Sequence, residues 1–182
     1  MVDECEIGGT LTDFVTGEKV ADTIMERIRQ RVERFLIENK HYSKGDIEVG
    51  KEFETVSEGG SDGKSEIIRS QADLIVRARD KRVIVIKCTC GSLLAKERLV
   101  LSYTRLLDPY QIPFAVVTNG EDAEVLDAIS GKTIGSELEA IPSINIEEIE
   151  FTKLSEDRIE KEKRILAAFE SIDETMCVGG RR

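Results

Sequence analysis

The chain has 182 residues, of which 40% are hydrophobic and 34% are charged, and its formal net charge at pH 7 is −10. This length suits a single domain, and the absence of a long apolar run, of a secretory leader and of a disulfide framework predicts a cytoplasmic protein that does not cross a membrane. Surfaces that bind nucleic acid are usually basic, so the acidic balance leaves only a local patch for such a partner.

The first half of the chain predicts one helix and three strands. Apolar residues three and four positions apart predict a helix over residues 19–38, with Asn39 as its stop. Alternating apolar residues predict a strand over residues 46–56, and a hairpin of two strands over residues 72–78 and 82–89 follows it. The last of these strands is apolar almost throughout, which is typical of a central strand covered on both faces.

The second half of the chain predicts two strands between two helices. The helices are expected over residues 92–107 and 155–172, and the strands over residues 113–120 and 123–134. Helices that alternate with strands in this way pack on a common sheet. The sequence therefore predicts an α/β fold in which helices flank a mixed β-sheet.

The pattern also predicts where the folded domain begins and ends. Residues 1–19 show no period and are expected to be a loosely ordered N-terminal segment. The folded domain is expected over residues 20–174, and residues 175–182 are expected to be a flexible tail.

Five segments of the chain form a series with a known counterpart. They are ERIRQRVERFLIENKHY, ADLIV, VIVIKCTCG, LSYTRLL and FAVVTNGEDAEVLDAISGK. Together they resemble the N-terminal domain of type I restriction enzyme R subunits, which belongs to the PD-(D/E)-x-K nuclease superfamily. The resemblance covers about residues 20–135 and implies a restriction-endonuclease-like fold and DNA as a partner.

The resemblance implies a catalytic site built around Mg²⁺. In that family a glutamate on the first helix, an aspartate on one strand and a Glu-x-Lys motif on the next strand surround one or two Mg²⁺ ions. Carboxylates bind this hard cation, which neutralises charge on the attacked phosphate and activates a water, and the lysine adds a positive donor. By position Glu26, Asp73 and Lys87 match the catalytic groups, and Glu26 and Asp73 match metal ligands.

The match to the family is incomplete at two positions. Val85 stands where the family has the glutamate of Glu-x-Lys, and Leu99 stands where it often has a glutamine, four residues before Tyr103. A lysine cannot replace a lost metal ligand, so these changes predict a degenerate metal site. Glu66, one strand away, is the candidate for a ligand that has migrated to the site.

Two thiols follow the lysine of this motif. Cys88 and Cys90 could hold a soft metal, but Zn²⁺ and iron–sulfur clusters need about four ligands. The other candidates for such a set are Cys5, Cys177 and His41. The pair alone therefore does not make a zinc or iron–sulfur site. Two further interpretations are a small apolar residue at a strand end and a redox-sensing thiolate beside Lys87.

Basic side chains on the first helix are candidate contacts to nucleic acid. Arg27, Arg31 and Arg34 lie on one face of that helix, and Lys64 and Arg69 follow in the next loop and strand. Such residues can bind phosphates. The three arginines could equally form an ordinary solvent-exposed face of the helix.

The sequence leaves three functional hypotheses open. The first is a restriction-endonuclease-like domain with an incomplete metal site, which binds nucleic acid or a partner protein with little or no cleavage. The second is an active Mg²⁺-dependent DNA endonuclease with a migrated ligand. The third is a cysteine-based metal or redox module. An exposed edge strand would be compatible with a homodimer in each case.

Overall fold

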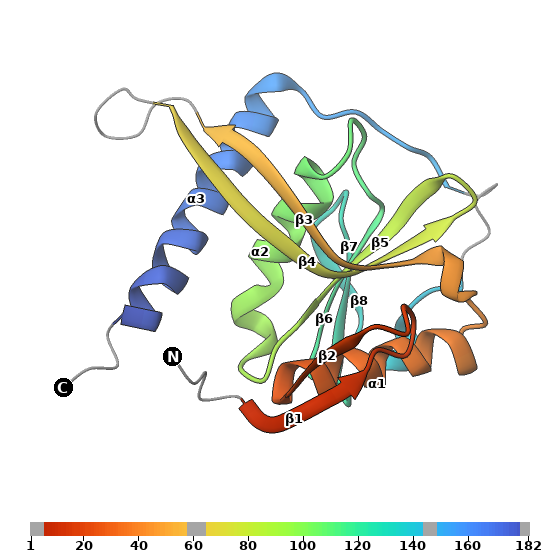
Figure 1. The fold of residues 1–182 in the computed structure, drawn as a ribbon. Helices are drawn as coiled ribbons and strands as arrows, with labels where there is room; N and C mark the ends of the chain where they lie inside the picture. The colour runs from red at the N-terminus through yellow and green to blue at the C-terminus, as the bar shows by residue number, and fades with distance from the viewer. Residues whose placement is uncertain (1–5, 58–64, 144–148, 179–182) are drawn as a thin grey trace.

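The computed structural model describes residues 6–57, 65–143 and 149–178 of the chain (Figure 1). Two short 3-10 helices, η1 (Lys44–Asp46) and η2 (Leu138–Ala140), connect longer elements. The longer elements follow the described chain in the order β1 (Glu6–Thr12), β2 (Lys19–Thr23), α1 (Ile24–Glu38), β3 (Ile47–Ser57), β4 (Glu66–Ala78), β5 (Lys81–Cys88), α2 (Leu93–Leu106), β6 (Phe114–Thr118), β7 (Ala123–Asp127), β8 (Lys132–Gly135) and α3 (Glu156–Val178).

A six-stranded mixed sheet forms the centre of the fold. Its strand order is β3-β4-β5-β6-β7-β8, and β5 and β6 run parallel while the other neighbours run antiparallel. Helix α1 covers one face of the sheet, and α2 and α3 cover the other (Figure 1). Each face has its own apolar cluster, one including Leu36 of α1 and the other including Leu99 and Leu166. The predicted mixed sheet flanked by helices is confirmed.

Strand β5 lies inside the sheet, as its composition predicts. Val83, Ile84, Val85 and Ile86 are all fully buried. A strand covered on both faces needs apolar residues at successive positions, because neither side of the pleat reaches water. Helix α2 then supplies the crossover that a parallel β5–β6 connection requires.

Helix α1 begins later than the sequence predicts. Thr23 caps it, because the Thr23 hydroxyl accepts a hydrogen bond from the backbone N–H of Glu26, and Asn39 ends it as expected. The five residues before Ile24, which the periodicity assigned to the helix, form β2 instead. Val20 fits both patterns, since one apolar residue does not distinguish a strand from a helix.

Strands β1 and β2 form an antiparallel hairpin where the sequence predicts loose order. The Asp13 carboxylate holds the turn, since it accepts hydrogen bonds from the backbone N–H groups of Val15 and Thr16 and from the Thr16 hydroxyl. Asp13 is only 2% exposed. The structure therefore differs from the expectation for residues 6–19, and residues 1–5 lie outside the described part.

Strand β4 changes face at Asp73. Ala72 belongs to the apolar cluster on the side of α2 and α3, whereas Leu74, two residues on, belongs to the cluster on the side of α1. Residues two apart in a regular strand share one face, so the alternation shifts at Asp73. Gly50 of β3 lies opposite Asp73 and has a φ of 61°, a conformation that glycine adopts without strain. Asp73 thus lies between the two faces.

Helix α3 is anchored to α2 by a buried carboxylate. Glu162 is fully buried and pairs with Arg98 at 2.5 Å, Arg105 at 3.1 Å and Arg158 at 3.1 Å. Leu166, one turn later, is also fully buried. The helix continues to Val178, beyond the predicted end near residue 172 and into the predicted tail, of which residues 179–182 lie outside the described part.

In the part of the chain that the structure describes, no helix combines the length and the apolar composition needed to span a membrane.

Candidate functional site

Asp73 and Lys87 lie opposite each other on neighbouring strands. The register that pairs Leu74 with Ile86 places them together. Lys87 Nζ donates to Asp73 Oδ1 at 3.1 Å, and the backbone N–H of Cys88 donates to Asp73 Oδ2 at 2.6 Å. The Lys87 and Asp73 side chains are 21% and 18% exposed. Both carboxylate oxygens of Asp73 are therefore already bonded to donors of the protein.

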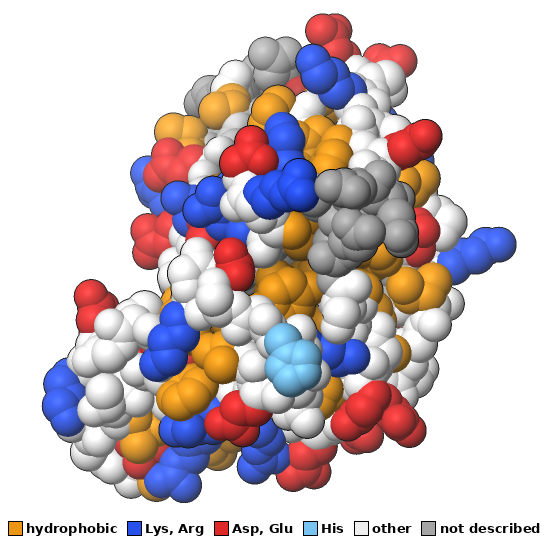
Figure 2. Space-filling view, turned by 90° about the vertical axis from the view of Figure 1, so that its right-hand side faces the viewer, with side chains coloured by type: hydrophobic (Ala, Val, Ile, Leu, Met, Phe, Trp, Pro, Cys, Tyr) orange, Lys and Arg blue, Asp and Glu red, His pale blue; other side chains and the backbone are white. Residues whose placement is uncertain are grey.

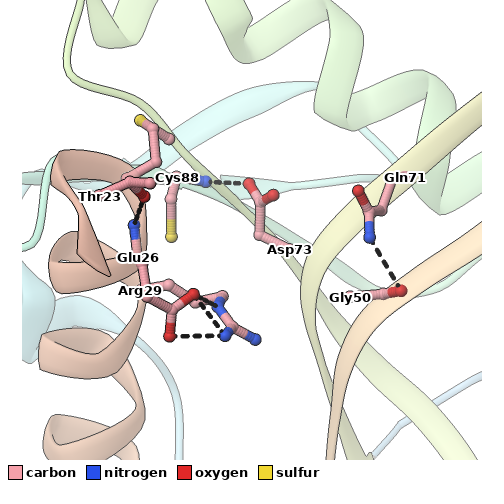
Figure 3. Close-up of a pocket in the computed structure, with 8 residues that line it drawn as sticks. Thr23, Glu26, Arg29, Gly50, Gln71, Asp73 and Cys88 are labelled. Atoms are coloured by element: carbon pink, nitrogen blue, oxygen red, sulfur yellow. Dashed lines mark hydrogen bonds and ion pairs between the residues drawn. The ribbon is translucent and has the colours of Figure 1, made fainter. Parts of the chain in front are cut away.

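Two hollows flank this pair. The first, here called the Glu26 hollow, has a volume of about 280 Å³ and is lined by Thr23, Met25, Glu26, Arg29, Gly50, Gln71, Asp73 and Cys88 (Figure 3). The second, here called the Lys87 hollow, has a volume of about 370 Å³ and is lined by Glu52, Phe53, Glu54, Arg69, Ser70, Gln71, Lys87, Leu99, Tyr103 and Glu170. Gln71 borders both hollows, so they are adjacent.

Glu26 and Asp73 line one hollow but turn to different partners. The Glu26 carboxylate accepts hydrogen bonds from Arg29 Nη2 at 2.6 Å and from Gln30 Nε2 at 2.8 Å. The Asp73 carboxylate is turned to the backbone N–H of Cys88 (Figure 3). The structure therefore brings both predicted acids to the Glu26 hollow while each is held by the protein itself.

Arg29 is a central charge of this site that sequence analysis missed. Its guanidinium contacts Asp13 at 2.7 Å, Glu26 at 2.6 Å and Glu33 at 3.5 Å, and its side chain is 12% exposed. Because a guanidinium stays charged at all ordinary pH values, it neutralises carboxylates permanently. The spacing of Glu26 and Glu33, three residues before and four after Arg29 on one helix, is the signal that could have found it, whereas Asp13 lies in the hairpin that shows no period.

Glu33 carries an unusual proton affinity in the same cluster. Burial raises its pKa to about 7, Arg29 opposes this rise, and the neighbouring carboxylates of Asp13 and Glu26 add to it. Its side chain is fully buried. The cluster therefore exchanges a proton near neutral pH, whereas an ordinary glutamate does so near pH 4.

The two positions that depart from the family pattern lie in one apolar cluster. Val85 is fully buried and Leu99 is 1% exposed, and both belong to the cluster on the side of α2 and α3. Lys87 lies two residues after Val85 but at the rim of the sheet. An acid at position 85 and an amide at position 99 would be buried polar groups that need hydrogen-bond partners. Valine and leucine fill the same space and need no such partners.

Glu66 does not approach this site. It opens β4 and pairs with Ser57, seven residues from Asp73, which is roughly 23 Å along an extended strand. Among the residues that the structure describes, no three side chains of His, Cys, Asp or Glu gather in a group that could hold a metal ion. The migration of Glu66 into the site is therefore contradicted by its position.

The two thiols after Lys87 have different environments. Cys88 is buried and its pKa is raised by burial and by the nearby Asp73 charge, so the thiol stays protonated, whereas Cys90 is exposed. A thiolate is the form that binds metals and reacts. The geometry therefore does not favour a joint metal or redox site at Cys88 and Cys90. His41 is exposed, and Cys5 and the side chain of Cys177 lie outside the described part.

The predicted nucleic-acid contacts are exposed but paired. Arg27 bonds Asp22 at 2.7 Å, Arg31 bonds Glu121 at 2.6 Å, and Arg69 bonds Glu54 at 2.7 Å. Arg34 stacks on the Phe14 ring at 4.1 Å. Lys64 lies outside the described residues. On the face shown in Figure 2, Lys and Arg side chains lie among Asp and Glu.

The Lys87 hollow contains a carboxylate from a distant part of the chain. Glu170 of α3 accepts a short hydrogen bond from the Ser70 hydroxyl, and the Tyr103 hydroxyl lies 3.5 Å from it. Burial and the Glu170 charge raise the pKa of Tyr103, so its hydroxyl stays a donor. The sequence predicts helix α3 but gives no signal for Glu170, because one hundred residues separate it from Ser70.

Comparison with protein families gives one match. The family model described as type I restriction enzyme R protein N terminus (HSDR_N) matches residues 25–142, from α1 through η2. The matched segment contains Glu26, Asp73 and Lys87, whereas the β1–β2 hairpin and α3 lie outside it. No curated protein and no solved structure matches the chain.

Proposed function

Since the chain belongs to the family of type I restriction enzyme R protein N-terminal domains, we propose that it is a restriction-endonuclease-like domain that binds nucleic acid and cleaves it little or not at all. Family membership supports the nucleic-acid partner. The pairing of Asp73 and Glu26 with other groups of the protein supports the loss of cleavage.

The observation that carries this proposal is that both carboxylate oxygens of Asp73 accept hydrogen bonds from the protein. A carboxylate that ligates Mg²⁺ places an oxygen about 2.0–2.1 Å from the ion, and that oxygen can keep a hydrogen bond on its other lone pair. Here one oxygen accepts from Lys87 and the other from the backbone of Cys88. The Lys87 ammonium lies 3.1 Å from both oxygens of Asp73, so its positive charge opposes a dication at the same carboxylate.

The remaining acids do not fit a Mg²⁺ site either. Glu26 is held by Arg29 and Gln30, and the position two residues before Lys87, where a second strand carboxylate would lie, is the buried Val85. The permanent charge of Arg29 offsets that of Glu26, which weakens the attraction of the Glu26 hollow for a dication. The acids at this site therefore do not form a Mg²⁺ site.

Basic side chains on α1 are the proposed contacts to phosphates. Arg27 and Arg31 are 55% and 56% exposed; the partner of Arg31, Glu121, is 76% exposed, whereas the partner of Arg27, Asp22, is 10% exposed. A pair exposed on both sides contributes only about 0–1 kcal/mol, so a phosphate can replace Glu121 at Arg31, and at Arg27 it can bind beside the existing pair. Few contacts of this kind predict weak binding that falls with salt.

Cleavage is tested with supercoiled plasmid and Mg²⁺ or Mn²⁺. We expect no nicking by the purified protein beyond that of an Asp73→Ala variant. Nicking by the wild-type protein that this substitution abolishes would instead support an active metal-dependent endonuclease.

Binding is tested by fluorescence anisotropy of a labelled oligonucleotide at 50 and 200 mM salt. We expect salt-sensitive binding that weakens by at least about fivefold in an Arg27→Ala/Arg31→Ala variant, as two lost phosphate contacts predict. A Lys153→Ala/Lys161→Ala variant, which removes two exposed charges elsewhere, serves as the control. Equal weakening in both variants would contradict a specific role for α1.

A further inference from the structure

The Lys87 hollow presents a set of donors suited to an anion. The ammonium of Lys87, which also pairs with Asp73, and the hydroxyls of Ser70 and Tyr103 border it, on β5, β4 and α2. Of the other charged lining residues besides Glu170, Glu54 is paired with Arg69, and Glu52 is exposed to water. Charged and neutral donors from several elements that meet in one concave site are the usual means of holding a phosphate group. The raised pKa of Tyr103 keeps its hydroxyl in the donor form.

An anion of the protein itself already contacts two of these donors. The Glu170 carboxylate accepts from the Ser70 hydroxyl, and the Tyr103 hydroxyl lies 3.5 Å from it. Glu170 is only partly buried, so its carboxylate can leave for water without a large desolvation cost. The contact is thus one that an external anion could replace.

Helix α3 is held in place without help from Glu170. Glu162, Leu166 and Glu170 are spaced four residues apart and so share one face of the helix. The first two are fully buried, and Glu162 is paired with three arginines. This anchoring fixes the helix and delivers Glu170 to the hollow, so loss of the Glu170 charge should leave the fold intact.

From this arrangement we propose that Glu170 occupies the Lys87 hollow in the place of a nucleic-acid phosphate, so that α3 restrains nucleic-acid binding by the same site. This inference rests on the proposed function. The phosphate would accept hydrogen bonds from Ser70 and Tyr103 and lie beside Lys87. The unbound chain keeps Glu170 in the hollow, and bound DNA displaces it.

The test compares charge-neutral variants of α3 in the full chain. Glu170→Gln keeps an acceptor but removes the charge, and Glu170→Ala removes the acceptor as well. Asp157→Asn makes the same charge change at an exposed position near the start of the helix and serves as the matched control. Circular dichroism and thermal melting check that each variant folds.

Affinity is measured with a fluorescein-labelled oligonucleotide at one fixed salt concentration. We expect Glu170→Gln and Glu170→Ala to bind at least about fivefold more tightly than wild type, close to 1 kcal/mol. Asp157→Asn should change the affinity by less than about twofold, because exposed charges are screened by salt. Equal affinities for the Glu170 variants and the control would overturn the inference.

A second substitution tests whether the increase in DNA affinity depends on the Lys87 hollow. In the Glu170→Ala background, Lys87→Met should remove most of the increase in affinity, since the proposed phosphate lies beside Lys87. A gain that persists without the lysine would mean that DNA binds elsewhere, which would also overturn the inference.

Thermal melting with pyrophosphate separates this inference from the proposed function. A larger pyrophosphate-induced rise in melting temperature for Glu170→Ala than for wild type, with no DNA binding by either, would support the phosphate site and contradict nucleic-acid binding. DNA binding by all variants with equal affinity would support nucleic-acid binding and overturn the role of Glu170. No response to DNA or pyrophosphate would contradict both.

Discussion

At the scale of single residues, the site is organised by charges that satisfy one another. Asp73 is paired with Lys87, and Glu26 is paired with Arg29. A buried or half-buried charge is stable only when it is paired and hydrogen-bonded. The protein itself supplies positive charge to both acids, and this local neutrality is the reason to expect weak affinity for a dication.

Glu33 should make stability depend on pH near neutrality. Its pKa is raised to about 7 in the folded chain, so the folded state binds the proton more tightly than the unfolded state does. The stabilising contribution of the protonated form is complete below about pH 4.5 and is lost as the pH rises through 7. Arg29, Asp13 and Glu26 are the charged groups that face this carboxyl.

Urea unfolding of a Glu33→Gln variant tests this expectation. The variant cannot lose a proton, so its stability relative to wild type should increase by on the order of 2–3 kcal/mol between pH 5 and pH 8. Glu38→Gln, at an exposed position of the same helix, is the control and should show a constant difference. A pH-independent difference for Glu33→Gln would mean that its pKa is ordinary.

The sequence predicts some residues of the site and not others. Asp73 and Lys87 are predicted from their match to the family motif, and the register of β4 and β5 places them opposite each other. Glu170 could not be predicted, since its partner Ser70 lies one hundred residues away. The pairing of Arg29 with Asp13 is also a tertiary contact, although its partners Glu26 and Glu33 lie on the same helix. Contacts of this kind depend on tertiary packing and leave no periodic pattern.

At the scale of elements, β5 carries the buried residue Val85 at the position where the family resemblance implies a catalytic glutamate. The cluster that contains Val85 has room for an apolar group, and a carboxylate there would be buried without a cation beside it. Val85→Glu should therefore lower the unfolding free energy by about 3–5 kcal/mol at pH 8. Leu99→Gln added to this variant should recover part of the loss by offering an amide partner.

Urea unfolding with Val85→Thr as the control checks the role of Val85. Threonine has the shape of valine and carries no charge, so it should cost clearly less than glutamate. If Val85→Glu were as stable as Val85→Thr at pH 8, position 85 would tolerate a charge, and the interpretation of Val85 as a packing residue would be wrong.

Helix α3 depends on its buried carboxylate. Glu162→Ala leaves Arg98 and Arg105 without their partner inside the fold and should cost about 3–5 kcal/mol in urea unfolding. Arg158→Ala removes a 44% exposed member of the same cluster and should cost less than about 1 kcal/mol. Similar losses in both variants would contradict the anchoring role of Glu162.

At the scale of the whole molecule, periodicity predicts the sheet and its helices but not the N-terminal hairpin. The predicted ranges of β3, β5, α2 and β6 are close to the observed ones, because long apolar runs and alternation are strong signals. By contrast, β4 begins at Glu66 and not near residue 72, and the one strand predicted over residues 123–134 forms two strands, β7 and β8. Strands β1 and β2 have seven and five residues, and β1 contains Gly8 and Gly9, which carry no side chain to form a pattern. Short strands of this kind are visible only through their pairing.

The hairpin and α3 both lie outside the segment that matches the family, and both contribute to the site. Asp13 of the hairpin turn binds Arg29, and Glu170 of α3 borders the Lys87 hollow. The segment shared with the family thus supplies Asp73 and Lys87, and the flanking elements place the charged groups Asp13 and Glu170 beside the site. The expected homodimer stays a prediction.

Calorimetric titration of the protein with Mn²⁺, beside an Asp73→Asn variant, tests the central claim most directly. With both oxygens of Asp73 held by Lys87 and Cys88, we expect wild type and variant to give the same weak heats, from the acidic surface alone. One equivalent of Mn²⁺ bound by wild type and lost in Asp73→Asn would show that Asp73 ligates the ion, and it would contradict the account.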